Sequence, residues 1–310
     1  MNSEVTLENV VQAYEARERA YREYERTHQF QDRQNFEDVK LALIPHLYDG
    51  DLEKFGRECQ IGSGQWLQEE DRFKIWADAK DHSVRLFWLQ GIPGAGTYCT
   101  WYRSHSDKYL VMSTGKTVMS SIIIHRMRNA GQNVLFAFLM HKNEAHNCAL
   151  KILHSLIFQV LIDNQALRPV MHEAYISNYR QITSSLDFTI ELFSDLIKDS
   201  GPTFIIIDGM DEIPEIERRL LLKALIGLFQ THKDVKLLVS SRGERDISSL
   251  LGNDVPSVRV DHRNKEDIDI YIQKEIDIWL PELQSLGADD QMCSEVKALS
   301  RSIVEKAKGL

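Results

Sequence analysis

The chain has 310 residues, 43% of them hydrophobic, and a formal net charge of −9. This hydrophobic content suffices for a full globular core and excludes wholesale disorder. An acidic chain without a run of Lys or Arg is a poor candidate for a nucleic-acid binder. No apolar run approaches the ~20 residues that cross a bilayer, so we expect no membrane span.

The four cysteines are Cys59, Cys99, Cys148 and Cys293. None belongs to a CxxC pair, and none lies at a zinc-site spacing from a histidine, so we interpret all four as reduced thiols. The first residues, MNSEVTLENV, lack the basic start and apolar stretch of a signal peptide. We therefore expect a cytoplasmic protein.

The N-terminal part predicts two helices, over residues 5–28 and 35–47, with Pro45 near the end of the second. Val10, Tyr14, Tyr21 and Tyr24 recur at helical spacing. We favour a helix that packs on its own domain or on a neighbouring helix; the alternative is a partner-binding arm. Residues 1–48 thus form an N-terminal helical region, and residues 49–83 form a connector with a short helix inside 64–78.

Five short apolar segments alternate with helical stretches in the middle of the chain. The apolar segments are residues 84–90, 134–140, 203–208, 235–241 and 257–260, and the helical stretches are 118–128, 149–162, 189–198 and 216–229. This alternation predicts a parallel sheet covered on both faces. The core domain spans 84–262, and Asn264 with Asp267 resembles the start of a helix in a C-terminal helical region, 263–310.

A phosphate-binding loop is present in two pieces. Residues 91–96, GIPGAG, follow an apolar segment and match the first six positions of a P-loop, and Gly115-Lys116-Thr117 supplies its end. Deleting residues 97–115 joins them as GIPGAGKT. Gly91, Gly94 and Gly96 would let backbone N–H groups surround a phosphate, Lys116 would reach the β- and γ-phosphates, and Thr117 would bind Mg²⁺.

The 97–115 insertion interrupts this loop. If Gly115 replaced Gly96, Leu110 would stand at the first glycine position, and residues 111–114 are poor formers of a phosphate cradle. The edges of the insertion can be encoded as GT and AG, so one hypothesis is a short intron translated in frame. The other is a genuine loop insertion, and sequencing the transcript separates the two.

The second half of the predicted site follows two later strands. Asp208 ends the 203–208 segment, where P-loop enzymes hold Mg²⁺ through water, and Asp211 and Glu212 stand where an acid could orient or deprotonate the attacking water. Arg242 follows the 235–241 segment; it either senses the γ-phosphate or is a surface arginine paired with an acid. His141 and His146 have no nucleophile partner, which favours a solvated loop.

Together these motifs resemble the NACHT domains of signal-transducing NTPases, particularly those of fungal NOD-like (STAND-class) proteins. The likeness rests on GSGQWLQEEDRFKIW, LFWLQGIPGAG with GKTVMSSIII, VLFAFLM, FIIIDGMDE, LLVSSR and NKEDIDIYI. It implies an α/β fold, the P-loop NTPase three-layer sandwich with a five-stranded parallel sheet, plus an N-terminal helical extension and C-terminal helices.

The resemblance also implies an ATP- or GTP-dependent switch, with Mg²⁺, that acts through self-association or other signalling proteins. By position, the glycine loop is Gly91, Gly94 and Gly96, completed by Gly115; Lys116 and Thr117 bind phosphate and Mg²⁺; Asp208 holds the metal; and Asp211, Glu212 and Arg242 act in catalysis. Two departures are the split loop and the absence of the winged-helix region and C-terminal repeats.

Two other functions compete with the NTP-hydrolysing switch. A catalytically inactive scaffold would act through protein contacts of the N-terminal helices, and the split loop favours it. A metabolite kinase would use the same loop but rarely carries both DGMDE and SSR. The sequence does not distinguish ATP from GTP.

Overall fold

The computed structural model describes residues 2–58, 64–91, 115–141, 148–252, 254–260, 265–287 and 289–306. Its elements in chain order are α1 Asn2–Leu43, α2 Asp49–Glu58, α3 Gln65–Glu69, α4 Asp71–Ala77, β1 Leu86–Gly91, α5 Gly115–Asn129, β2 Asn133–Phe138, α6 Ala149–Asp163, η2 Gln165–Leu167, α7 Arg168–Ser184, α8 Leu186–Ile197, β3 Thr203–Asp208, η3 Met210–Glu212, α9 Glu215–Thr231, β4 Val235–Arg242, α10 Arg245–Leu251, β5 Ser257–Val260, α11 Lys265–Ser285 and α12 Asp290–Lys306.

The five strands form one parallel sheet in the order β2-β3-β4-β1-β5. Each strand lies within two residues of its predicted range, because a continuous apolar run is what a strand buried on both faces requires. In a parallel sheet all strands end at the same edge, so β1, β3 and β4 deliver Gly91, Asp208 and Arg242 to one edge. The predicted α/β fold is confirmed.

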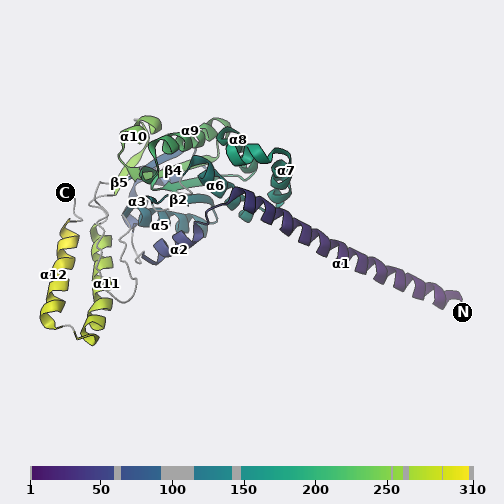
Figure 1. Cartoon of the computed structure of the whole chain (residues 1–310), viewed down its shortest axis with the longest axis horizontal. Helices are drawn as coiled ribbons and strands as arrows, with labels where there is room; N and C mark the ends of the chain where they lie inside the picture. Colours follow the sequence, from purple (N-terminus) through teal and green to yellow (C-terminus); the bar gives the residue numbers. More distant parts are fainter. Residues whose placement is uncertain are drawn as a thin grey trace.

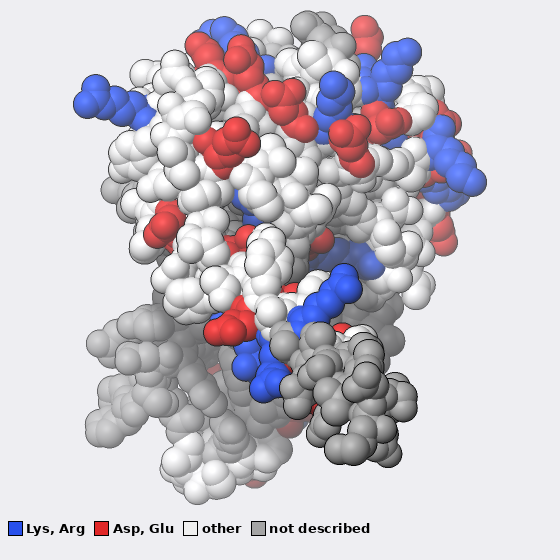
Figure 2. All heavy atoms as spheres, turned by 90° about the vertical axis from the view of Figure 1, so that its right-hand side faces the viewer, with Lys and Arg blue, Asp and Glu red and all other residues white. Residues whose placement is uncertain are grey.

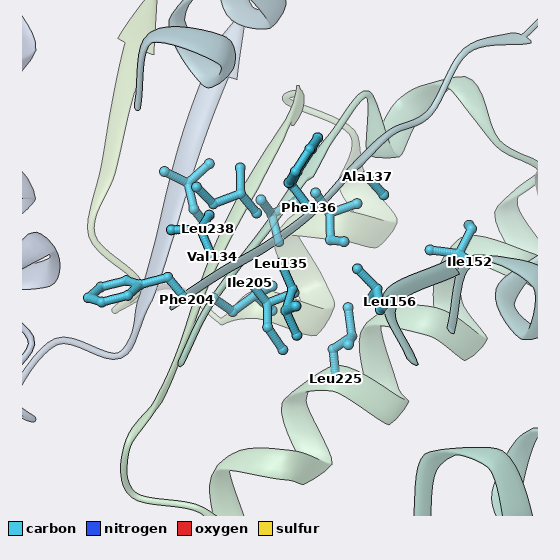
Figure 3. Close-up of a cluster of buried hydrophobic side chains, with 14 of the residues drawn as sticks. Val134, Leu135, Phe136, Ala137, Ile152, Leu156, Phe204, Ile205, Leu225 and Leu238 are labelled. Carbon is cyan, nitrogen blue, oxygen red and sulfur yellow. The ribbon is translucent and has the colours of Figure 1, made fainter. Parts of the chain in front are cut away.

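Helices cover both faces of this sheet and complete three layers (Figure 1). On one face α6 and α9 pack on the strands, with α8 against both helices. Figure 3 shows the centre of that layer, where Leu135 of β2 and Ile205 of β3 lie beside Leu156 of α6 and Leu225 of α9. On the other face α5 contacts four strands, and α2 and α4 add aromatic side chains.

The outer edge of the sheet is covered by a side chain. Gln159 of α6 accepts a hydrogen bond from the backbone N–H of Phe136 at 3.0 Å and donates one to the carbonyl oxygen of Phe136 at 2.7 Å. Both groups belong to β2, the edge strand, and unpaired groups there would invite pairing with another strand. A buried amide thus satisfies both outward-facing backbone groups of one residue of the edge strand.

The N-terminal region is one long helix, and the two separate helices predicted there are wrong. α1 runs from Asn2 to Leu43 and ends just before Pro45, at Ile44, which has a positive φ of 47°. Figure 1 shows α1 projecting from the body of the molecule, and only its C-terminal part contacts α6 and α7. The polar residues between the predicted pieces continue the helix because all of them tolerate helical backbone in water.

Further elements differ from the predictions. α2, α7 and α10 were not predicted: α2 lies in the stretch interpreted as a connector, and in α7 only Met171 and Ile182 are buried. The predicted short helix in residues 64–78 is two helices, α3 and α4, separated by Glu70 in extended conformation. After β5, α11 and α12 pack on each other. Asn264, the predicted helix cap, lies outside the described residues.

Figure 2 views the molecule from the side toward which α1 projects. Lys and Arg side chains lie interleaved with Asp and Glu over the upper part of this face, as on an ordinary solvated surface. None of the helices within the described residues combines the length and hydropathy needed to cross a membrane.

Candidate phosphate-binding site

Lys116 and Thr117 lie in the first turn of α5, whose N-terminus faces the end of β1. The Lys116 side chain is only 5% exposed and lies against Gly91, the last residue of β1. A Cβ atom added at Gly91 would stand 2.5 Å from both Cδ and Nζ of Lys116. Any larger residue would therefore occupy the space that the lysine uses, which gives a physical reason for glycine at this position.

The connection between β1 and α5 falls outside the described residues. It contains Gly94 and Gly96 and the predicted insertion up to residue 114, so the predicted roles of both glycines stay predictions. Gly115, the last residue of the insertion, opens α5. What the structure places is therefore the two ends of the loop, Gly91 and Gly115, with the lysine and threonine beside them.

Asp208, at the end of β3, is the centre of a buried polar cluster. Thr117 Oγ1 donates to Asp208 Oδ2 at 2.7 Å, and Ser120 Oγ donates to Oδ1 at 2.8 Å. The carboxyl is 2% exposed, and burial raises its pKa above the usual value. Hydrogen bonds from Thr117 and Ser120 and the charge of Lys116 oppose that shift. A buried carboxylate with this many donors is a group arranged to carry charge.

The chain turns sharply directly after Asp208. Gly209 has a φ of +76°, and a Cβ atom there would collide with the carbonyl oxygen of Leu139, next to the end of β2. Glycine is the one residue that combines this conformation with this close approach. The turn leads into the short helix η3, and the Glu212 N–H donates to the Gly209 carbonyl at 2.8 Å. The turn at Gly209 thus sets the position of Asp211 and Glu212 relative to Asp208.

Asp211 and Glu212 are adjacent in sequence but reach different strands. Asp211 Oδ1 accepts the backbone N–H of Arg242 at 2.9 Å, and Asp211 Oδ2 lies 3.2 Å from Arg242 Nε. Glu212 Oε2 instead accepts the backbone N–H of His141, beyond β2, at 3.0 Å. Burial raises the pKa of Glu212, and the charges of Asp208 and Asp211 add to that rise. Arg242 thus lies at the end of β4, as predicted, and is paired with an acid, Asp211.

Some residues of this cluster were missed by sequence reasoning. Ser120 lies three residues after Thr117, one helical turn on, so the spacing alone could have placed both hydroxyls on the face toward Asp208. The alternation of side chains along β4 indicates which face of the strand carries Ser240, but only the sheet order places β4 beside β3. The backbone group at His141 carries no sequence signal. His146 lies outside the described residues.

The oxygen donors around Asp208 suit a magnesium ion. Mg²⁺ takes oxygen ligands, keeps several waters and is usually held by one or two carboxylates together with substrate phosphates. Within the described part of the chain no group of three or more His, Cys, Asp or Glu forms a metal cage. One buried carboxylate next to a threonine hydroxyl and a lysine therefore fits a metal that arrives with a phosphate ligand.

The family described as Nephrocystin 3, N-terminal, matches the chain over residues 62–100 and 97–242, which is more than half of its length. The two matched segments meet at residues 97–100, where the predicted insertion begins. A comparison with curated proteins finds no match.

Three solved structures illustrate the matches found among known structures. The Walker-type ATPase PABY2304 of Pyrococcus abyssi is 11% identical, with a TM-score of 0.40, over 77% of this chain and 66% of that chain. Drosophila ORC bound to GC-rich DNA and Cdc6 is 8% identical, with a TM-score of 0.37, over 90% of this chain and 41% of that chain. C. elegans PCH-2 is 14% identical, with a TM-score of 0.31, over 83% of this chain and 53% of that chain. This chain spans less than two thirds of each of them, and we draw no conclusion from TM-scores this low.

Proposed function

Since the chain belongs to the Nephrocystin 3, N-terminal family, we propose that it is a nucleotide-dependent signalling switch that binds ATP or GTP with Mg²⁺. The observation that carries the proposal is the meeting of Thr117 and Asp208 at 2.7 Å beside the buried Lys116. The proposal of a nucleoside-triphosphate site rests on this cluster of residues. The proposal of a NACHT-type switch rests on the sequence motifs.

Each side chain has a defined task in this proposal. Lys116, at the positive end of α5, binds the β- and γ-phosphates, and the N–H groups of the first helical turn face the same ligand. Thr117, with its hydroxyl, and Asp208, with its carboxylate, would hold the metal. Mg²⁺, when bound, neutralises charge on the phosphate oxygens. Glu212, with its pKa raised, accepts a proton from the attacking water more readily than an ordinary glutamate.

The domain arrangement in this proposal follows the sequence boundaries. Residues 84–262 form the nucleotide-binding core with an insertion at 97–115, residues 1–48 and 49–83 precede it, and residues 263–310 begin a C-terminal helical region. Whether a phosphate loop so interrupted still holds a nucleotide is the main question for experiment.

Isothermal titration of the purified chain with Mg·ATP, Mg·GTP and Mg·ADP tests the proposal. We expect binding that Lys116→Ala abolishes, because the lysine supplies the charge that meets the phosphates. A chain lacking residues 97–115 is expected to bind at least as tightly, since its loop reads GIPGAGKT. Lys223→Ala, at an exposed lysine of α9, is the matched control and should leave binding unchanged. Unaltered affinity in Lys116→Ala would refute the assignment of Lys116.

A second candidate is an inactive scaffold that acts through α1, and one observation favours it. Tyr14, Tyr21 and Tyr24 on the projecting part of α1 are 58–66% exposed. An exposed row of aromatic side chains is typical of a surface that contacts another protein. The scaffold is supported if neither form of the chain binds a nucleotide while light scattering shows association that is lost on removal of residues 1–28.

A further inference from the structure

The two acids after Asp208 are held in different ways, and this separates their roles. The Asp211 side chain is 7% exposed, and both of its oxygens are engaged by Arg242, one by the backbone N–H and one by Nε. Glu212 is exposed and uses one oxygen, Oε2, for the His141 N–H. An acid that takes a proton from water needs an oxygen within about 2.6–3.2 Å of that water. Both oxygens of Asp211 are engaged by Arg242, whereas the bond to His141 occupies only one oxygen of Glu212.

The partner of Asp211 lies at a particular point of the site. Arg242 is opposite Gly91 in the pairing of β4 with β1, and neighbouring strands lie about 4.8 Å apart. The arginine thus ends its strand next to the start of the phosphate loop. A guanidinium has five N–H donors, and the contact with Asp211 through Nε uses the one nearest the chain. The Arg242 side chain is 48% exposed, so a ligand at this edge of the sheet can reach its other N–H groups.

We propose that Asp211 is a positioning residue that holds Arg242 toward the terminal phosphate, so that Asp211 acts only through the arginine. This inference rests on the proposed function, because it requires a nucleotide in the site. It goes beyond that function by assigning the two acids of DGMDE separate tasks. Arg242 distinguishes a triphosphate from a diphosphate by a charge-assisted contact to the γ-phosphate, and Asp211 fixes where that contact is made.

The ratio of the ATP and ADP affinities is the appropriate measurement, since a general loss of structure weakens both nucleotides alike. Arg242→Ala should lower the affinity for Mg·ATP about tenfold relative to Mg·ADP, the scale of one lost charge-assisted contact. Asp211→Asn should lower the ratio by a similar factor with ADP affinity retained. The double variant should be no worse than either single one, because both changes remove the same contact.

The control variants are matched in chemistry. Glu215→Gln removes the acid of another carboxylate–arginine pair, Glu215 with Arg219 at 3.4 Å on the surface of α9, and should leave the ratio unchanged. Asp211→Ser keeps a smaller polar side chain at this position and replaces Asp211→Asn in the cycle if that variant fails to fold. Thermal unfolding of each variant establishes that it is folded.

The outcomes separate this inference from the proposed function. If the unmodified chain binds no Mg·ATP, the proposed function fails. If it binds, and the losses in Asp211→Asn and Arg242→Ala multiply in the double variant, Asp211 acts independently and the inference is wrong. A ratio unchanged in either single variant overturns it as well. The inference is supported if both single variants and the double variant lower the ratio of ATP to ADP affinity by the same factor while ADP binding stays normal.

Discussion

At the scale of single residues, the site depends on small spaces and on buried charge. Gly91 leaves the room that Lys116 fills, and the hydroxyls of Thr117 and Ser120 donate to the buried Asp208. Motif spacing predicted the lysine, the threonine and the aspartate. Ser120 could have been added from its helical spacing to Thr117, but its bond to Asp208 also requires α5 to pack beside the end of β3, which distance along the chain does not give.

Buried Lys236, outside the site, is a second residue whose contacts could not be predicted from the sequence. Its Nζ donates to the carbonyl oxygens of Ile75 at 3.3 Å and Trp76 at 2.8 Å, in the last turn of α4. The side chain is 1% exposed, and burial lowers its pKa below the usual value. A cation at a helix C-terminus is favourable because it meets the free carbonyls. In the sequence this lysine is only a polar residue within an apolar strand.

Gly91→Ala tests the space at the end of β1. The added methyl group would overlap the far end of the flexible Lys116 side chain, which must then move aside, so we expect weaker binding of Mg·ATP and a loss of about 1 kcal/mol or less in the free energy of unfolding. Urea denaturation and calorimetry measure the two effects.

Gly227→Ala is the control for that substitution. No atom lies within 4 Å of the added Cβ, and the residue is exposed within α9, so the same change should stabilise by roughly 0.5–1 kcal/mol. If Gly91→Ala binds Mg·ATP as tightly as the wild type, the contact of Lys116 with Gly91 does not matter for phosphate binding.

At the scale of elements, a buried histidine joins three helices. His154 of α6 has no exposed surface; its Nδ1 lies 3.1 Å from the carbonyl oxygen of Leu43 in α1, and its Nε2 lies 2.8 Å from that of Ile182 in α7. Lys151 Nζ also donates to the Leu43 carbonyl, at 3.4 Å. A neutral imidazole has one N–H, so only the protonated ring can donate to both carbonyls. Burial nevertheless lowers the pKa of His154 below 6.5, and Lys151 adds to that fall.

This lowered pKa predicts a pH dependence of stability. The unfolded chain binds the proton of His154 more readily than the folded chain does, so the free energy of unfolding should fall as the pH drops below about 6.5. The contribution of one proton is at most about 1.4 kcal/mol per pH unit. Urea titrations between pH 7.5 and 5 measure it as the difference between the wild type and His154→Gln.

Other groups also titrate in this range, so the comparison needs a second histidine variant. His28→Gln removes an exposed histidine of α1, at 58% side-chain exposure, and should keep the wild-type pH dependence. A His154→Gln chain that loses stability at low pH as steeply as the wild type would contradict the prediction.

At the scale of the whole molecule, the body of the protein and the projecting part of α1 are stabilised differently. The body has a two-faced core around the parallel sheet. α1 joins it only through its last turns, where Phe36 stacks on Phe158 at 5.3 Å and Arg168 lies 4.0 Å above the Phe36 ring. Further out, Glu15–Arg19 and Glu18–Arg22 are ion pairs between exposed side chains, which contribute little.

Truncation tests this division of the molecule. Removing residues 1–28 should change the free energy of unfolding by less than about 0.5 kcal/mol, since no core contact is lost. Phe36→Ala should lower it by about 2 kcal/mol or more, because a stacked aromatic contact in the body disappears. A loss of several kcal/mol on truncation would mean that the projecting part packs on a partner, and light scattering would then identify a second copy.

Sequence by itself determined the fold class and the strands, and it predicted the residues of the site. Long apolar runs must be buried on both sides, so their alternation with helices leaves few folds, and a strand ending in Asp208 or a helix starting at Lys116 is readable from neighbouring residues. Tertiary structure alone decided which side chains meet: Ser120 with Asp208, Asp211 with Arg242, and His154 with carbonyl groups of two other helices. The physical reason is that these contacts depend on the order of strands and the packing of helices, which side-chain periodicity does not encode.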